Sequence, residues 1–268
     1  MRQVDGLLAK LSLAWVLAKQ DLTNRYANSY AGVVWTIGVP LLYAIINVMV
    51  FSILMSGRMG ERYGDIPFAL FYFVPLSIWI FFAEMTSRST NILREYSYLI
   101  NKIAFPFWIL PLVPILSALI SQAIILAITA GLLAYHGIGV ASSIWVYVVV
   151  CLIGWVLTLG VCYASSALAM YIPDLGQIVP IAINIIFWLT PILYPATLVE
   201  ADGPLWVRSI IMDWNPFFYL VETARHAFFG TAAIAWSALA GVATLAVVVF
   251  VAGLGVFKKL KPGFADVI

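Results

Sequence analysis

The sequence predicts an all-α integral membrane protein with six transmembrane helices, built as one domain over residues 1–268. Three observations lead to this fold class. Hydrophobic residues make up 64% of the chain and charged residues 10%, whereas soluble domains hold roughly 45–50% apolar and about 25% charged residues. Six long runs contain no charged residue, and most Lys and Arg residues gather between alternate runs.

Each of the six runs is close to or above the length of a membrane span, which needs about 20 apolar residues. The third run opens with the proline-rich segment FPFWILPLVP, which delays the start of regular helix. The fourth is expected to become helical near Ser143, and only the breakers in YIPDLGQ separate it from the fifth. The runs cover residues 31–55, 66–83, 103–135, 137–173, 175–199 and 227–257.

The distribution of positive charge predicts the orientation. Six spans place both termini on one side, and short cytoplasmic loops are enriched in Lys and Arg. With the N-terminus in the cytoplasm, ten of the 14 Lys and Arg residues lie on the cytoplasmic side, so we expect both termini there. The ten are Arg2, Lys10, Lys19, Arg25, Arg88, Arg94, Lys102, Lys258, Lys259 and Lys261, and those on the outer side are Arg58, Arg62, Arg208 and Arg225.

The two ends of the chain are expected to lie on the cytoplasmic side of the membrane. Residues 1–30 do not resemble a cleaved signal peptide, because Lys10 and Lys19 interrupt any apolar core. We predict a helix at the membrane surface instead, with Trp15 at headgroup level. Residues 258–268 would form a short cytoplasmic tail.

The motifs argue against an enzyme and against an ion-coupled transporter. No GxSxG, HExxH or phosphate-binding GxxxxGK[ST] pattern occurs. The two histidines, His136 and His226, are too few for a metal site. A proton relay or ion site needs ionisable residues within the spans, but the runs contain none, and Glu84 and Asp174 are expected at span edges. Intramembrane polar residues, expected to hydrogen-bond between helices, are Asn47, Gln122 and Asn184.

A conduit with little charge and many aromatic rings remains. Aromatic residues make up 15% of the chain. An aromatic side chain with a polar tip suits a sugar, because its face can stack on a pyranose ring while its OH or NH reaches hydroxyls. The same residue types also anchor helices at the membrane interface, and composition does not separate the two. The candidates for the lining are Trp35, Tyr43, Phe187, Trp188 and Tyr194.

The stretch WLTPILYP, residues 188–195, is predicted to end the fifth span early. Its two prolines, Pro191 and Pro195, break the helix. Irregular backbone is tolerated at membrane depth only where protein buries it or where it lines a watery cavity. The break is therefore expected to serve a turn back into the membrane.

The outer segment 195–226 is too apolar for a free loop and predicts short re-entrant or interfacial helices. Turns are expected at Asp202-Gly203-Pro204 and at Asn215-Pro216. Glu222 and Arg225 have the i, i+3 spacing of an ion pair on a helix.

Three stretches together resemble the permease of bacterial polysaccharide exporters within the type 2 ABC exporter family. They are DLTNRYANSYAGVVWTIGVPLLY at 21–43, YLINKIAFPFWILPL at 98–112, and a third set made of PILYPATLV, WNPFFYLVETAR and FADVI. The order and spacing of these motifs match along nearly the whole chain. Each motif alone is weak, and the set is specific.

The resemblance implies a homodimer of this chain with two separate ATPase subunits on the cytoplasmic face of the bacterial inner membrane. The substrate would be an undecaprenyl-linked polysaccharide such as O antigen, capsule or teichoic acid polymer. This chain would then be a transport subunit that binds no cofactor and no nucleic acid. ATP and magnesium would be bound by the ATPase, which explains the missing phosphate loop.

The resemblance also implies roles for particular residues. The cytoplasmic loop 88–105 would couple to the ATPase, and a solvated loop without that role is the alternative. A gate around the N-terminal segment would contact the head group of the lipid-linked substrate. The alternative is that the positive charge of this segment only attracts anionic lipid. The external gate would be formed by segment 195–226. The coupling residues are Glu95, Tyr98, Asn101 and Lys102, the cytoplasmic gate residues are Asp21, Arg25 and Tyr26, and the external gate residues are Trp206, Trp214, Asn215, Pro216, Glu222 and Arg225.

Two positions depart from the family pattern. Phe107-Trp108 stands where charged residues are common, and YIPD replaces a basic stretch before the fifth span. Salt bridges to an ATPase at these places are therefore in doubt. Two other functions stay open: an ABC permease for a drug or small lipid, and a membrane-embedded enzyme acting on lipid carriers.

Overall fold

The computed structural model describes residues 6–24, 34–100 and 105–266, and in these ranges it consists of helices, turns and bends without a strand. Four helical segments are long and apolar enough to cross a membrane, and two shorter apolar helices accompany them. The long segments are Phe68–Glu95, Phe107–His136, Ser142–Tyr171 and Trp236–Phe264, and the shorter ones are Leu41–Leu54 and Leu175–Leu189.

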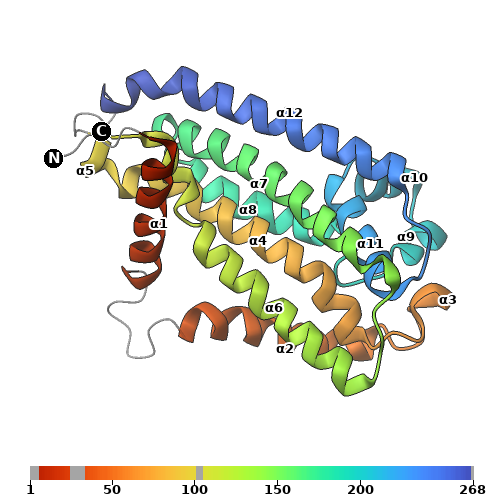
Figure 1. The fold of residues 1–268 in the computed structure, drawn as a ribbon. Helices are drawn as coiled ribbons and strands as arrows, with labels where there is room; N and C mark the ends of the chain where they lie inside the picture. Colours follow the sequence, from red (N-terminus) through yellow and green to blue (C-terminus); the bar gives the residue numbers. More distant parts are fainter. Residues whose placement is uncertain (1–5, 25–33, 101–104, 267–268) are drawn as a thin grey trace.

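The helices form one bundle with several short elements at its ends (Figure 1). The longer helices are α1 (Leu7–Asn24), α2 (Val34–Leu54), α4 (Phe68–Glu95), α6 (Ile115–His136), α7 (Trp145–Tyr171), α8 (Leu175–Leu189), α11 (Pro216–Phe229) and α12 (Trp236–Leu260). The short elements are α3 (Gly60–Tyr63), α5 (Ser97–Ile100), η1 (Phe107–Leu112), η2 (Ser142–Ile144), α9 (Ala196–Asp202), α10 (Leu205–Arg208), the π-helical η3 (Ser209–Asp213) and η4 (Lys261–Asp266).

The first four expected spans each contain a helix, with shifted boundaries in the second. The prolines of the third run do delay regular helix, which begins at Ile115 after the 3₁₀ segment η1. The fourth begins at Trp145, as expected from its sequence. The second run was expected to end at residue 83 and to be followed by a loop, but α4 continues to Glu95. Residues 88–95 are therefore helical, and Glu84 lies inside this helix and not at its edge.

The last two expected spans are each shorter in the structure. The fifth helix ends at Leu189, ten residues before the charge-free run ends at 199 and inside the stretch 188–195, which was predicted to end this span early. The sixth run was expected to begin at Ala227. That residue instead belongs to α11, which ends where Gly230 adopts φ +65°, a left-handed conformation that glycine accepts readily.

Helix α4 lies at the centre of the bundle and packs against α2, α6, α7, α8 and α11. The closest helix pair is α7 with α12, which cross at Gly160 and Gly253. A Cβ atom on Gly253 would lie 2.1 Å from the carbonyl oxygen of Gly160. Only glycine permits this approach of the two backbones.

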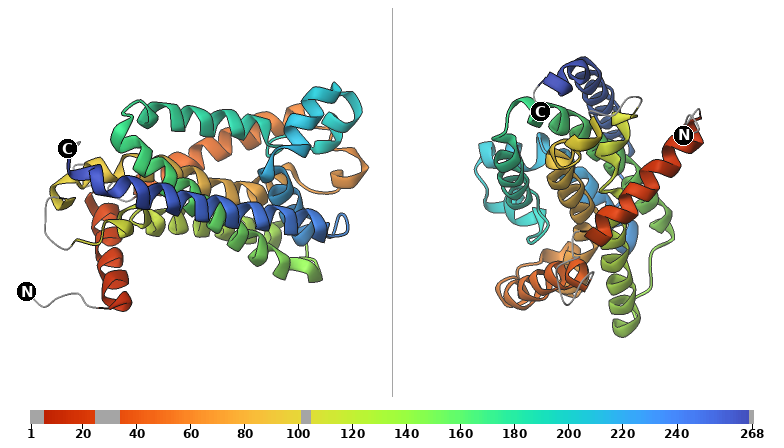
Figure 2. Two further views of the ribbon diagram at one scale, coloured as in Figure 1. Left: turned by 90° about the horizontal axis from the view of Figure 1, so that it is seen from above. Right: turned by 90° about the vertical axis from the view of Figure 1, so that its left-hand side faces the viewer.

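The bundle has two distinct ends (Figure 1). Helices α1 and α5 lie at the end where α12 finishes, which we call the α5 end. Helices α3, α9, α10 and α11 lie at the opposite end, which we call the α11 end. Helix α1 runs across the bundle axis in the views of Figures 1 and 2.

Polar side chains inside the bundle hydrogen-bond between helices, as predicted for two of the three intramembrane amides. Gln122 on α6 accepts from Trp155 Nε1 on α7 at 3.0 Å. Asn47 on α2 donates to the Tyr72 hydroxyl on α4 at 3.1 Å. The third amide, Asn184, is exposed on α8 instead, which directs attention to the surface beside it.

Candidate substrate groove and the networks at its two ends

A groove of about 630 Å³ lies between α2, α4 and α8. Each helix presents one face to it through side chains three or four residues apart, the spacing that places residues on the same side of a helix. The lining residues are Tyr43, Ile46, Asn47, Trp79, Ala83, Ser87, Pro180, Ile183, Asn184, Phe187 and Trp188. A second, shallower hollow continues along α8 past Asn184 and Trp188.

Aromatic rings form one wall of the groove. Trp79 of α4 lies 5.6 Å from Phe187 of α8, measured between ring centroids, and Phe187 lies 5.7 Å from Trp188 in an edge-to-face arrangement. Trp79 is buried and holds Phe187 in place, whereas Trp188 is 54% exposed and Tyr43 is 67% exposed. Broad ring faces are therefore open to whatever occupies the groove.

The polar groups of the groove are uncharged. None of the lining residues is an Asp, Glu, Lys or Arg. Among the described residues, neither the Asn184 amide nor the Ser87 hydroxyl has a side-chain hydrogen-bond partner, while the Asn47 amide nitrogen is engaged by Tyr72. The groove thus combines aromatic faces with neutral donors and acceptors, the set of groups that suits a polyhydroxylated ligand.

The structure brings three of the five predicted aromatic lining residues into the groove: Tyr43, Phe187 and Trp188. Trp35 lies exposed at the start of α2 and is not among the lining residues. Tyr194 lies beyond the end of α8, where its hydroxyl donates to the carbonyl oxygen of Trp188 at 3.1 Å.

Sequence reasoning missed Trp79, Ser87 and the exposed role of Asn184. A usable signal existed for the first two, since Trp79, Ala83 and Ser87 recur every fourth residue along one helix. The stripe does not stand out in the sequence, because apolar residues occupy every face of α4 along most of its length.

The interrupted end of α8 is stabilised by Asn215. Its Nδ2 donates to the Leu189 carbonyl oxygen at 3.3 Å and to the Thr190 hydroxyl at 2.9 Å. Its Oδ1 accepts from the backbone N–H of Phe217 at 3.0 Å, so the same side chain caps α11. Pro216 follows at the first helical position, where it needs no N–H partner. The predicted break at Asn215-Pro216 is therefore confirmed.

Arg225 stabilises the irregular chain after α8. It is 0% exposed, and its Nη2 donates to the Ile192 carbonyl oxygen at 2.9 Å. Its Nε donates to the Phe71 carbonyl oxygen of α4 at 3.2 Å, and the guanidinium lies 3.6 Å from the centroid of the Phe71 ring. The predicted pair with Glu222 is confirmed, with Nη1 to Oε1 at 2.6 Å.

Tyr63 of α3 completes this buried cluster by donating its hydroxyl to the second carboxylate oxygen of Glu222. Burial raises the pKa of Tyr63 above its ordinary value, and the negative charge of Glu222 adds to the increase. The cluster joins α3, α4, α11 and the chain after α8. Of the predicted external gate residues, Asn215, Glu222 and Arg225 are thus buried, while Trp206 and Trp214 are exposed at the α11 end.

A second network lies at the α5 end. Arg88 of α4 contacts Asp21 of α1 through Nη2 at 2.8 Å and Glu95 through Nη1 at 2.8 Å. Tyr98 of α5 stacks on Tyr96 with 6.1 Å between ring centroids. Burial raises the pKa of Tyr96 to about 12, with a further contribution from the charge of Asp21. The predicted residues Arg25, Tyr26, Asn101 and Lys102 lie outside the described residues.

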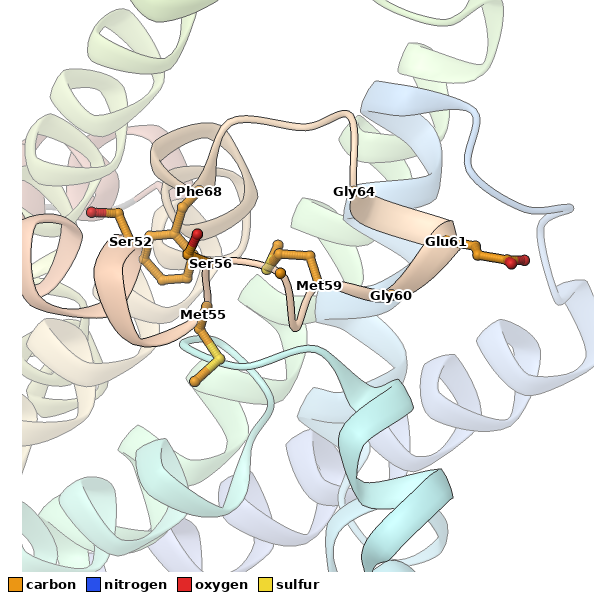
Figure 3. A pocket seen from close by; sticks show the side chains of 9 residues that line it. Ser52, Met55, Ser56, Met59, Gly60, Glu61, Gly64 and Phe68 are labelled. Atoms are coloured by element: carbon orange, nitrogen blue, oxygen red, sulfur yellow. The ribbon is translucent and has the colours of Figure 1, made fainter.

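A separate hollow of about 530 Å³ lies at the α11 end between α2, α3 and the start of α4 (Figure 3). Ser52 and Ser56 face it, but the Ser52 hydroxyl is already bonded to the Met49 carbonyl oxygen. The carboxylate of Glu61 points away from the other labelled side chains in Figure 3. The one aromatic ring that lines this hollow, Phe68, is buried, so the groove with its exposed Tyr43 and Trp188 is the better candidate for a ligand that stacks on rings.

No group of three or more His, Cys, Asp or Glu side chains in the described part of the chain could hold a metal ion. A bundle of helices that include four segments long and apolar enough to cross a membrane is the fold of an integral membrane protein. The sequence profile of the ABC-2 type transporter family matches residues 12–229, and the chain belongs to this family. Members of the family are transport subunits that work with a nucleotide-binding ATPase partner in a membrane.

Similar curated proteins carry a more specific name. The chain is 26% identical over 266 residues to an O-antigen export system permease protein RfbA of Myxococcus xanthus, covering 99% of each chain. It is 24% identical over 254 residues to a protein of the same name from Klebsiella pneumoniae, and 26% identical over 255 residues to a second one. These matches cover 94% of this chain and 93% of each relative.

Proposed function

We propose that this chain is the channel-forming permease subunit of an ABC transporter that exports undecaprenyl-linked polysaccharide, O antigen in particular, across the bacterial inner membrane. ATP hydrolysis in a separate ATPase subunit drives the transport, and ATP and magnesium bind to that subunit. The observation that carries the proposal is the uncharged aromatic groove with its free Asn184 and Ser87 groups. The names of the three relatives point to the same substrate.

The groove suits a polymer that must be held and then released. Stacking on Trp188 and Tyr43 stabilises a sugar ring without fixing its sequence, because every pyranose has an apolar face. Neutral groups such as Asn184 exchange hydrogen bonds with successive hydroxyls. A fixed charge would bind one sugar repeat more tightly than another and slow its release, so its absence from the lining favours stepwise passage.

On one chain the groove is open along its length, and a second copy of the chain would close it. The outer faces of α2 and α8 carry exposed apolar side chains that a partner would cover. They include Val39, Leu42, Ile45, Met49, Ile53, Ile178, Ile181 and Ile185. Two copies facing each other through α2 and α8 would enclose a conduit with aromatic walls from both subunits.

The proposed topology has six spans, with both termini in the cytoplasm. The α5 end would then face the cytoplasm and receive the two ATPase subunits at α5 and the residues that follow it, including Lys102. The α11 end would face outward, where Trp206 and Trp214 of the exposed α10–η3 region would form the exit. The positive charges at α12's last turn, Lys258 and Lys259, agree with a cytoplasmic α5 end.

A small lipid or drug is the second candidate substrate. Ile46 and Ile183 give the groove an aliphatic floor that would also accept an acyl or prenyl chain. The two candidates differ in their need for Asn184, because an apolar substrate makes no use of its amide.

A strain lacking this chain tests the proposed function. We expect undecaprenyl-linked glycan to accumulate inside the cells and polymer to disappear from the surface, with both reversed by the wild-type chain. Complementation by Asn184→Leu should be weak if the substrate is a polysaccharide and complete if it is a small lipid. Normal surface polysaccharide in the deletion strain, without internal glycan, would overturn the proposal.

A further inference from the structure

Arg88 holds two acidic residues that belong to different parts of the α5 end. Its Nη2 donates to Asp21 Oδ1 at 2.8 Å. The same guanidinium binds both carboxylate oxygens of Glu95, with Nη1 to Oε1 at 2.8 Å and Nη2 to Oε2 at 2.9 Å. Its Nε is buried and has no hydrogen-bond partner among the described residues. The guanidinium is therefore enclosed between the two acids and is not a freely moving surface charge.

The two acids differ in their surroundings. The side chain of Asp21 is only 8% exposed and lies near the end of α1, whereas that of Glu95 is 41% exposed and is the last residue of α4. The chain enters α5 two residues later. Arg88 thus ties the helix that crosses the bundle to the point where α4 passes into α5.

Packing reinforces this connection. Ala14 and Leu17 of α1 belong to one apolar cluster with Ile92, Leu93 and Tyr96 from the end of α4. In the described part of the chain, α1 packs mainly against α6 and η1, and η1 packs in turn against α4. The Arg88–Asp21 ion pair and this shared cluster therefore join α1 to the end of α4.

We infer that Arg88 is a positioning residue that couples the α5 end to α1, so that a movement imposed at α5 shifts α1. The inference rests on the proposed function, in which an ATPase binds the α5 end, and on the gate that the family resemblance implies for the N-terminal segment. Arginine suits this role because its planar fork can hold two carboxylates at once. A lysine ammonium is a single point charge and does not reproduce that geometry.

Glu84 is a further acidic residue on this part of α4. It lies one turn before Arg88 on α4, and its Oε2 accepts from the Ser121 hydroxyl of α6 at 2.6 Å. Asp21 and Glu84 have further interactions beyond these. The test variants therefore change the charge of Arg88 alone or reverse the charges of Asp21, Arg88 and Glu95 together. Glu84 is left unchanged in all of them.

The test uses the complex of this chain with its ATPase in lipid nanodiscs. Spin labels at Ser12→Cys on α1 and Lys258→Cys on α12 report the position of α1, since both sites are exposed and the two native cysteines are buried. In the otherwise wild-type complex we expect the distance between labels to change between the nucleotide-free and ATP-trapped states. In Arg88→Gln the change should disappear while ATP hydrolysis continues.

The functional readout is polymer exported per ATP hydrolysed. Arg88→Gln and Arg88→Lys should lower this ratio about tenfold, a size typical of coupling between sites. The triple variant Asp21→Arg, Arg88→Glu, Glu95→Arg reverses every charge of the network and should restore both the ratio and the distance change. Restoration would distinguish coupling from a mere loss of folding.

Arg94→Ala is the matched control. Arg94 lies six residues after Arg88, in the last turn of α4, and donates to the Met170 carbonyl oxygen at 3.3 Å, without an ion pair in the described part of the chain. It should leave the ratio and the distance change as in the wild type. An unchanged distance response in Arg88→Gln, or no ATP-dependent response in the wild type, would overturn the inference. The distance measurement needs no substrate, so its result is independent of whether polysaccharide is the cargo.

Discussion

Arg225 donates from Nη2 to the carbonyl oxygen of Ile192 at 2.9 Å, and this contact explains how the chain can leave α8 so early. Ile192 follows the last residue of the helix, Leu189, by three positions, within a stretch broken by proline. A buried carbonyl group without a partner is costly. A buried arginine from α11 supplies that partner, while Glu222 balances its charge.

Removing Arg225 should destabilise the whole α11 end. Arg225→Met keeps the volume but leaves Glu222 as a buried charge without its partner and the Ile192 and Phe71 carbonyl groups without their donor. A loss of about 3–5 kcal/mol is expected for breaking a buried pair in this way. Thermal unfolding in nanodiscs measures it, with Arg208→Ala on exposed α10 as the control. An unchanged unfolding temperature would contradict the role given to Arg225.

Substitutions at Asn215 should separate its two tasks. Asn215→Ala loses the cap of α11 and the donor to Leu189 and Thr190, at a cost of about 1–3 kcal/mol. Asn215→Ser keeps a capping oxygen, worth about 1 kcal/mol, but is too short to bridge to Thr190. The unfolding temperature of the serine variant should lie between those of wild type and alanine. Equal values for Ser and Ala would show that the cap contributes nothing.

The α7–α12 crossing should reject any side chain at Gly253. A Cβ atom there would lie 2.1 Å from a backbone oxygen, so Gly253→Ala forces the helices apart and should cost about 1–3 kcal/mol. Gly255→Ala on the same helix is the control, because a Cβ there meets nothing within 4 Å. If both variants unfold at the wild-type temperature, the close crossing is not required.

Much of the fold follows from the sequence because membrane spans have a strong signal. A helix satisfies its own backbone hydrogen bonds in lipid, so a long charge-free run predicts a helix, and the existence of the helices was predictable. Their ends were less so. Helix α4 carries Arg88 and Glu95 in its last turns. In the sequence alone, a charged residue that pairs with another helix looks the same as a charged residue in a solvated loop. Tertiary contacts, such as Asp21 with Arg88, decide the boundary.

The site was predicted only where an aromatic residue happened to lie on the correct face. Phe187 and Trp188 follow each other on α8 and both reach the groove, one as the inner wall and one as an exposed rim. Trp35 and Tyr194 have the same chemistry but lie elsewhere: Trp35 is at the start of α2, outside the lining, and Tyr194 follows the end of α8. Glu222 and Arg225 were predicted as a pair, and their burial followed only from the three-dimensional arrangement.

Changes in the groove should lower export without preventing assembly. Trp188→Ala removes an exposed stacking face. A stacking contact of about 0.5–1.5 kcal/mol corresponds to a loss of export of about two- to tenfold. Asn184→Leu should give a similar loss through its amide. Export is measured as surface polymer per assembled complex, and Trp236→Ala, an exposed tryptophan on α12 outside the groove, serves as the control. Equal export in the groove and control variants would argue that Trp188 is only a membrane anchor.

The central claim is that the groove between α2, α4 and α8 carries a sugar polymer, and photocrosslinking tests it most directly. A photoreactive amino acid is placed at Tyr43, Trp188 or, as a control, Trp236, in a complex whose ATPase binds but does not hydrolyse ATP. Radiolabelled undecaprenyl-linked glycan is then supplied. The groove account predicts label on the chain at 43 and 188 and little at 236. Equal labelling at the three positions, or none at 43 and 188, would contradict it.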